Sequence, residues 1–127
     1  MLLSIVTLTR CKKDKTDFRD GFVANYSVAE TWTENSKTIT KPTFTMSIEK
    51  SSQDANKVLL NNFANYGAGI TAEATISGNN LTIPQQTLSN SKAISGTGSL
   101  SGSTLTFTYT ESYNSVSINI TSTALKR

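Results

Sequence analysis

Apolar and polar residues alternate one by one along most of this chain, which is the pattern of β-strands that bury one face and expose the other to water. Residues 104–110, for example, read Thr-Leu-Thr-Phe-Thr-Tyr-Thr, and helical spacing of apolar residues does not recur. Pro84 interrupts one of the alternating segments, as expected for a bulge or an edge position. The pattern predicts an all-β chain of eight strands, near residues 26–32, 44–48, 58–63, 70–76, 81–83, 94–100, 105–109 and 116–120.

Turns rich in Gly and Asn separate consecutive strands of this series. Ser77-Gly78-Asn79-Asn80 lies between the fourth and fifth strands, and Ser101-Gly102-Ser103 lies between the sixth and seventh. Gly and Asn tolerate the positive φ that tight hairpins require. Because no long crossover separates the strands, we expect an antiparallel up-and-down meander that closes into a barrel and so removes exposed edges. An immunoglobulin-like β-sandwich is the alternative arrangement of eight such strands.

The segment from Asp20-Gly21-Phe22 to Trp32, followed by the meander, resembles the calycin, or lipocalin-like, architecture. Val23 stands where the Gly-x-Trp motif of that family has its tryptophan. The resemblance implies one domain over residues 21–127, an eight-stranded lipocalin-like barrel. The interior of such a barrel is either filled by side chains or holds a small ligand.

Hydroxyl and amide side chains supply most of the polarity of the chain. Ser, Thr and Asn make up 48 of the 127 residues, whereas charged residues make up 17%. Thr is β-branched and suits the solvated face of a strand, so this excess agrees with the predicted sheet. The chain has no His, and Cys11 is its single cysteine, which excludes a Ser-His-Asp triad, a His-ligated metal and an intrachain disulfide. Since no pair of carboxylates stands out as acid and base, we expect no enzymatic activity, metal or cofactor.

The net charge of +3 belongs mainly to the ends of the chain. Residues 1–20 contain five basic and three acidic residues, and Lys126 and Arg127 end the sequence. The chain lacks the clustered basic stripe that is typical of nucleic-acid binding. We therefore expect a monomer that binds no nucleic acid.

The first twenty residues have the features of a secreted protein. Residues 2–8 are mostly apolar but far fewer than the ~20 that span a bilayer, so they indicate the hydrophobic region of a secretory signal. The run Cys11-Lys12-Lys13-Asp14 resembles the lipobox cysteine and charged start of small Gram-negative lipoproteins, with Arg10 where that family has a small residue. This resemblance implies a signal-peptide remnant over residues 1–10, a lipidated Cys11 and a polar tether over residues 11–20. It also implies a lipid anchor in the outer membrane, facing the periplasm or the cell surface; a free thiol in a frayed terminus is the alternative.

Several residues on the apolar faces of the predicted strands are candidates for a ligand site. Glu30 shares such a face, so it is either buried, where a carboxylate could anchor a ligand, or it reaches water or pairs with a Lys. A β-sandwich would instead present Tyr66 and Tyr113 on loops, as an adhesion or carbohydrate-binding module does. Four aromatic residues either form the core or line a cavity for a small apolar or amphipathic ligand, namely Tyr26, Trp32, Phe107 and Tyr109.

Overall fold

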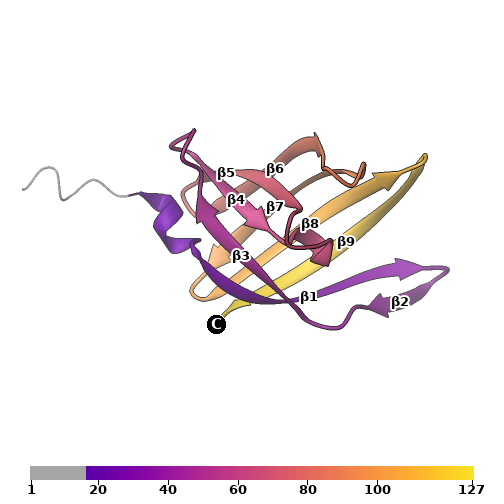
Figure 1. Ribbon diagram of the computed structural model, residues 1–127. Coiled ribbons are helices and arrows are strands. Elements are labelled where there is room, and N and C mark those ends of the chain that lie inside the picture. Colours follow the sequence, from indigo (N-terminus) through magenta and orange to yellow (C-terminus); the bar gives the residue numbers. More distant parts are fainter. Residues whose placement is uncertain (1–16) are drawn as a thin grey trace, which may run out of the picture.

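The alternating segments form an antiparallel barrel in the computed structural model, which describes residues 17–127 (Figure 1). Two short 3-10 helices accompany the strands, η1 (Phe18–Gly21) before the first strand and η2 (Phe63–Asn65) after the fourth. No helix in this part of the chain is long and apolar enough to cross a membrane. The strands are β1 (Ala24–Glu34), β2 (Lys37–Thr40), β3 (Phe44–Lys50), β4 (Lys57–Asn61), β5 (Thr71–Ser77), β6 (Asn80–Thr87), β7 (Ala93–Ser101), β8 (Thr104–Tyr113) and β9 (Val116–Lys126).

A single closed sheet forms the wall of the barrel. Strands that follow one another along the sheet are antiparallel, and pairing of β1 with β9 closes the wall. Strands β2 and β3 share one edge of β1, because residues 31–34 pair with β2 and residues 24–28 pair with β3. Pro42, which has no N–H for a ladder, lies at the break between them. The wall therefore has the eight strand positions that the alternation predicts, in an up-and-down meander that fits a lipocalin-like barrel. The sandwich alternative is wrong, and β2 was not predicted.

Four hairpins turn through two residues each, in two different ways. Gly78-Asn79 and Gly102-Ser103 join strands at one end of the barrel, and each glycine has a φ of 62°. Asn35-Ser36 and Asn114-Ser115 join strands at the other end, and all four residues have φ between 49° and 65°. A positive φ at both central residues, as in the turns of this second kind, is typical of type I′ turns. The right-handed twist of such turns matches that of the flanking strands.

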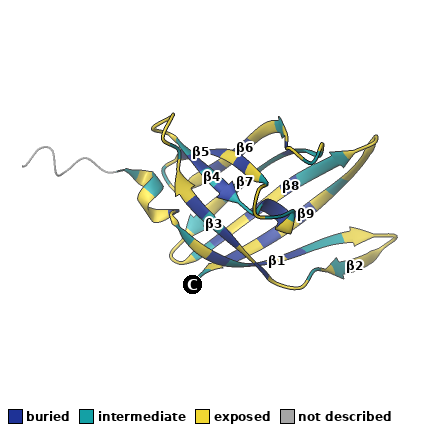
Figure 2. Cartoon of the chain, viewed as in Figure 1, coloured by how far each residue is buried: buried dark blue, intermediate teal, exposed yellow. Residues whose placement is uncertain are grey.

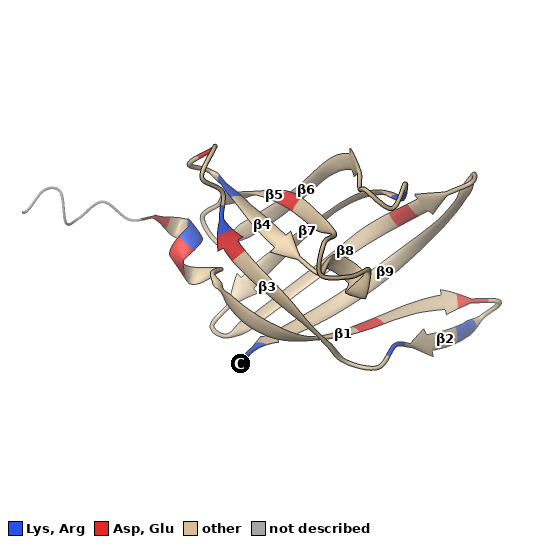
Figure 3. Cartoon of the chain, in the orientation of Figure 1, with Lys and Arg blue, Asp and Glu red and all other residues tan. Residues whose placement is uncertain are grey.

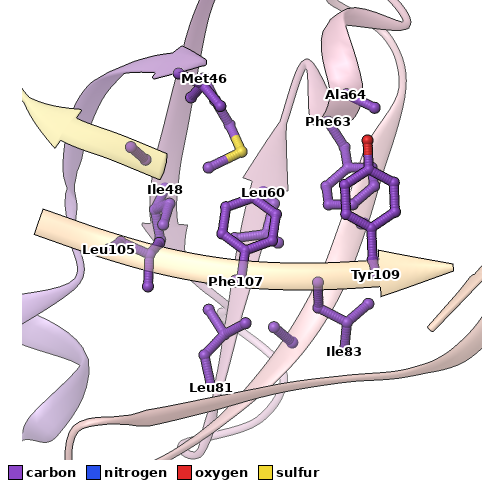
Figure 4. Close-up of a cluster of buried hydrophobic side chains, with 14 of the residues drawn as sticks. Met46, Ile48, Leu60, Phe63, Ala64, Leu81, Ile83, Leu105, Phe107 and Tyr109 are labelled. Atoms are coloured by element: carbon purple, nitrogen blue, oxygen red, sulfur yellow. The ribbon is translucent and has the colours of Figure 1, made fainter. Parts of the chain in front are cut away.

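The interior of the barrel is filled by the apolar faces of all the strands except β2, which has no buried residue. Exposed and buried residues alternate along the strands in Figure 2, as the sequence pattern predicts. Phe63, from the loop that follows β4, enters the interior and lies edge-on to Tyr109, with 4.7 Å between the ring centroids. Phe107 lies 6.0 Å from Tyr109 in a stacked orientation (Figure 4). Aromatic pairs in these geometries contribute about 0.5–1.5 kcal/mol beyond their buried area.

Two glycines in β7 allow these aromatic residues to pack against its backbone. Gly96 pairs with Tyr109 and Gly98 pairs with Phe107 across the β7–β8 ladder. A β-carbon at Gly96 would lie 2.7 Å from the β-carbon of Tyr109, and one at Gly98 would lie 2.9 Å from the α-carbon of Phe107. Both distances are shorter than real contacts of this kind, so only glycine fits at these positions.

One unbroken row of threonines crosses seven strands on the outer surface. Successive members of the row are cross-strand partners, and the row crosses the β9–β1 closure of the barrel. Cross-strand Thr pairs contribute roughly 0.2–1 kcal/mol each relative to alanine. The Thr excess of the sequence is therefore concentrated where strands meet on the solvated face. In sheet order the row is Thr75, Thr82, Thr97, Thr108, Thr121, Thr31 and Thr40.

The η1 helix covers one end of the barrel, here called the closed end. Phe22 follows η1 and is fully buried, and the Tyr26 hydroxyl donates a hydrogen bond to the Phe22 carbonyl oxygen at 2.7 Å. The Arg19 guanidinium donates to the carbonyl oxygens of Ser51 at 3.1 Å and Lys57 at 3.2 Å, which fixes η1 to the loop between β3 and β4. Residues 17–20, the last four of the predicted tether, are therefore part of the folded barrel. Cys11 and the predicted signal remnant lie outside the described residues.

Candidate ligand site at the open end

The opposite end of the barrel, here called the open end, contains a pocket of about 370 Å³. The β1–β2 turn, the connection from β2 to β3, the loop from β4 to β5 and the loop from β6 to β7 all lie at this end. Side chains from β1, β8, β9 and three of these connections line the pocket, among them Trp32, Lys41, Tyr66, Lys92 and Ile118. Figure 3 shows charged residues around η1, in the loop from β3 to β4 and at the tip of the β1–β2 hairpin, with others along β1, β5 and β8. The volume is within the range of small-molecule sites.

Glu30 is fully buried next to this pocket and is surrounded by donors. The Tyr109 hydroxyl lies 2.9 Å and 3.0 Å from its two carboxylate oxygens, and the Ser122 hydroxyl donates to it at 2.8 Å. The Lys41 ammonium lies 3.3 Å from Glu30 and also donates to the carbonyl oxygen of Ala64 at 3.0 Å. Of the alternatives for Glu30, burial and pairing with a Lys are both confirmed, and contact with water is wrong.

Burial and the Glu30 carboxylate together raise the pKa of Tyr109 far above its usual value. Burial disfavours the phenolate, and the adjacent negative charge disfavours it further. Tyr109 therefore stays protonated and donates its hydroxyl proton to Glu30. This arrangement fixes the carboxylate in place beneath the pocket.

A second ion pair lies at the rim of the pocket. The Lys92 ammonium is 3.0 Å from Glu111 and lies over the ring of Tyr66, 4.9 Å from its centroid. Lys41 lies over the Trp32 ring at 5.8 Å. Two ammonium groups and two carboxylates thus surround the pocket, so their formal charges cancel.

Two buried polar atoms at this end have no hydrogen-bond partner among residues 17–127. They are the indole nitrogen Nε1 of Trp32 and the hydroxyl oxygen of Tyr66. Burial raises the pKa of Tyr66, so its hydroxyl stays protonated and remains a donor. An unsatisfied buried donor costs roughly 1–3 kcal/mol. A molecule with hydrogen-bond acceptors in this pocket would remove that cost.

The structure separates the five predicted site residues into two groups. Tyr26 and Phe107 are packed in the core, whereas Trp32 lines the pocket and Glu30 and Tyr109 lie beneath it. Their contact with a ligand stays a prediction.

Sequence reasoning missed Lys41, Lys92 and Glu111, which come from two connections and one strand. No local motif marks them, because each becomes part of the site only through the closure of the barrel. The two tyrosines considered for loop display differ. The Tyr66 hydroxyl is buried at the pocket, and Tyr113 at the end of β8 is 47% exposed.

A solved structure shares the fold of this barrel, although the chain matches no family model and no curated protein. It is the crystal structure of a "putative outer membrane protein" from Bacteroides fragilis NCTC 9343, with a TM-score of 0.56 and 16% sequence identity. The match covers 87% of this chain and 53% of that chain, so this chain spans about half the length of that protein. At this identity the likeness shows a common fold and nothing more.

Proposed function

We propose that this protein is a lipid-anchored protein of the bacterial cell envelope whose barrel binds a small amphipathic molecule at its open end. The observation that carries the ligand proposal is the pair of unpartnered donors, Trp32 Nε1 and the Tyr66 hydroxyl, beside a pocket of about 370 Å³. Acceptor atoms of the molecule would bind these donors, and its apolar part would contact the Trp32 ring and Ile118.

The anchor proposal depends on the sequence of the N-terminal segment. An apolar run, a single cysteine and a dense charged stretch occur in that order, with Cys11 as the acylated residue. The structural neighbour described as an outer membrane protein supports the same compartment by analogy of fold. The fold at residues 17–20 leaves only five residues between Cys11 and the barrel, so the lipid would hold the closed end near the membrane and the open end away from it.

Native mass spectrometry of protein purified from envelopes tests the ligand. We expect an adduct of constant mass on the unmodified protein and its loss from the Trp32→Phe/Tyr66→Phe double variant, which keeps an aromatic ring at both positions but removes both donors. Tyr113→Phe, which removes a hydroxyl that is outside the pocket, should keep the adduct. Equal adduct levels in all three proteins, or no adduct in any, would contradict ligand binding at this site.

Incorporation of radiolabelled palmitate tests the anchor. We expect label and membrane association in the unmodified protein and neither in Cys11→Ala. Equal labelling of the two proteins would refute lipidation at Cys11 and would leave the ligand proposal unaffected.

A further inference from the structure

The wall of the barrel splits between β1 and β9 at the open end. The ladder that joins these strands stops at the Thr31–Thr121 pair, although β1 continues to Glu34 and β9 begins at Val116. Figure 1 shows the β1–β2 hairpin diverging from the β8–β9 hairpin toward their tips. A cleft of about 720 Å³ lies between the two hairpins. Both edges of this cleft are strand edges.

On the β1 side, the free backbone groups belong to Thr33. Glu34 pairs with Lys37 across a two-residue turn, so its backbone bonds toward β2. The carbonyl oxygen of Glu30 accepts the N–H of Lys41 on that same edge at 3.0 Å. Backbone groups of successive residues point to opposite edges of a strand, so those of alternate residues share one edge. Thr33 therefore presents its N–H and C=O to the cleft.

On the β9 side, the free backbone groups belong to Ser117 and Asn119. Val116 pairs with Tyr113 across the Asn114-Ser115 turn, so the backbone groups of Val116 bond toward β8. The backbone groups of Ser117 and Asn119 therefore point to the opposite edge of β9, toward the cleft. Within the described chain, Thr33, Ser117 and Asn119 have no ladder partner on this side. The unpaired donors and acceptors of one residue on β1 and two residues on β9 face each other, which is a template for an added strand.

We propose that this cleft binds an extended peptide segment of another protein, which inserts as a strand between β1 and β9. A strand residue with its side chain occupies roughly 160 Å³, from a rise of about 3.4 Å, a strand spacing of about 4.8 Å and a sheet spacing of about 10 Å. The cleft therefore holds about four residues. That length agrees with residues 116–120, the part of β9 that does not pair with β1.

The lining of the cleft defines the side chains of this peptide. Trp32 and Ile118 line both the cleft and the pocket of the open end, so inward-facing residues of the peptide are apolar. Thr33 and Asn119 line it on the outer face, where the peptide carries polar side chains. Glu34 is the one charged residue in the lining of the cleft. It favours neutral or basic residues of the peptide next to it. Peptide binding uses backbone groups that the proposed small molecule does not, so the two proposals stand independently.

Amide hydrogen exchange in the presence of a synthetic peptide tests the proposal. The probe is the acetylated and amidated peptide Lys-Thr-Val-Thr-Ile-Thr-Lys. At saturation we expect exchange of the Thr33, Ser117 and Asn119 amides to slow at least tenfold. The amide of Thr40, which points to the outer edge of β2 and does not line the cleft, should exchange at its original rate. Unchanged exchange at all four amides up to millimolar peptide would overturn the proposal.

Two matched changes separate backbone pairing from side-chain contact. A peptide N-methylated at alternate residues keeps its side chains but loses donors, and we expect it to bind at least tenfold more weakly. Thr33→Pro, which removes the N–H that faces the cleft, should weaken binding by a similar factor, whereas Thr33→Val should not. Equal affinity of the unmodified protein for the methylated and unmethylated peptides would refute strand insertion. This comparison needs no variant of the protein. Protection of the same amides in a dimer without peptide would assign the cleft to a second copy of the chain and would also refute the proposal.

Discussion

Replacing Tyr109 by Phe isolates the hydrogen bonds that hold the buried Glu30. The change keeps the ring that packs against Phe63 and removes only the hydroxyl, which lies 2.9 Å and 3.0 Å from the carboxylate oxygens. A hydrogen bond to a charged group contributes about 1.5–3 kcal/mol, and Glu30 cannot exchange the lost donor for water because it is fully buried. We therefore expect the free energy of unfolding to fall by about 2–3 kcal/mol.

Urea unfolding followed by Trp32 fluorescence measures this loss. With a slope of about 2 kcal/mol per molar urea, the midpoint should fall by roughly 1 M. Tyr26→Phe is the matched control, because its hydroxyl donates to a neutral carbonyl oxygen, and we expect a smaller loss of about 0.5–1.5 kcal/mol. In a Glu30→Gln background the cost of Tyr109→Phe should fall to about 1 kcal/mol, since the acceptor is then neutral. A cost that is the same in both backgrounds would refute the assignment of the hydroxyl energy to Glu30.

Three further predictions concern packing, pH and turns. Gly96→Ala should lower the free energy of unfolding by about 3 kcal/mol or more, because the new methyl group would overlap the β7–β8 backbone. Gly69→Ala should change the free energy of unfolding by less than about 1 kcal/mol, because open space surrounds Gly69. Similar losses in the Gly96 and Gly69 variants would refute the close approach of Gly96 to β8. Burial raises the pKa of Tyr26 to about 12 and also raises those of the other buried phenols, so the folded state keeps protons that the unfolded chain releases. Stability should therefore hold below pH 10 and fall between pH 10 and 12, measured by urea unfolding at fixed pH with tyrosinate absorbance at 295 nm; a flat profile contradicts this. Ser36 has a φ of 65°, so Ser36→Gly should raise the free energy of unfolding by about 0.5–1 kcal/mol. Ser103 has no positive φ, so Ser103→Gly should not raise it. Equal effects of the two Ser changes in calorimetry would remove turn strain as the cause.

The strands were predictable because inside and outside residues differ in polarity at every step. The segment around Phe107 alternates with threonines, and the structure places it in β8 with that alternation preserved. The short strand β2 was missed because its residues, Lys-Thr-Ile-Thr, contain one apolar side chain and show too little contrast. It forms because the Asn35-Ser36 turn folds it back along β1.

The site was predictable only in part, since its partners are distant in sequence. Glu30 was identifiable as a carboxylate on an apolar face, and pairing with a Lys was among its alternatives. The Lys41 contact follows from the β1–β2 hairpin, which brings the Lys41 N–H to the Glu30 carbonyl oxygen. That the hydroxyls of Tyr109 and Ser122 also reach Glu30 depends on the registers with which β9 meets β1 and β8. No local pattern encodes those registers.

The threonine row does not by itself fix the register between neighbouring strands. On β7 and β8, positions two residues away from the row again carry hydroxyls, as Ser95 and Ser99 do beside Thr97 and as Thr106 and Thr110 do beside Thr108. If β8 slid along β7 by two residues, hydroxyl would still pair with hydroxyl outside. The outer face of this pair of strands therefore does not select one sliding position over another, and the inner face selects the register. On the inner face, Tyr109 and Phe107 fit only opposite Gly96 and Gly98, because any side chain at those two positions would overlap them. The two glycines of β7 thus fix the register of β8, and that register is one part of the stagger with which the barrel closes.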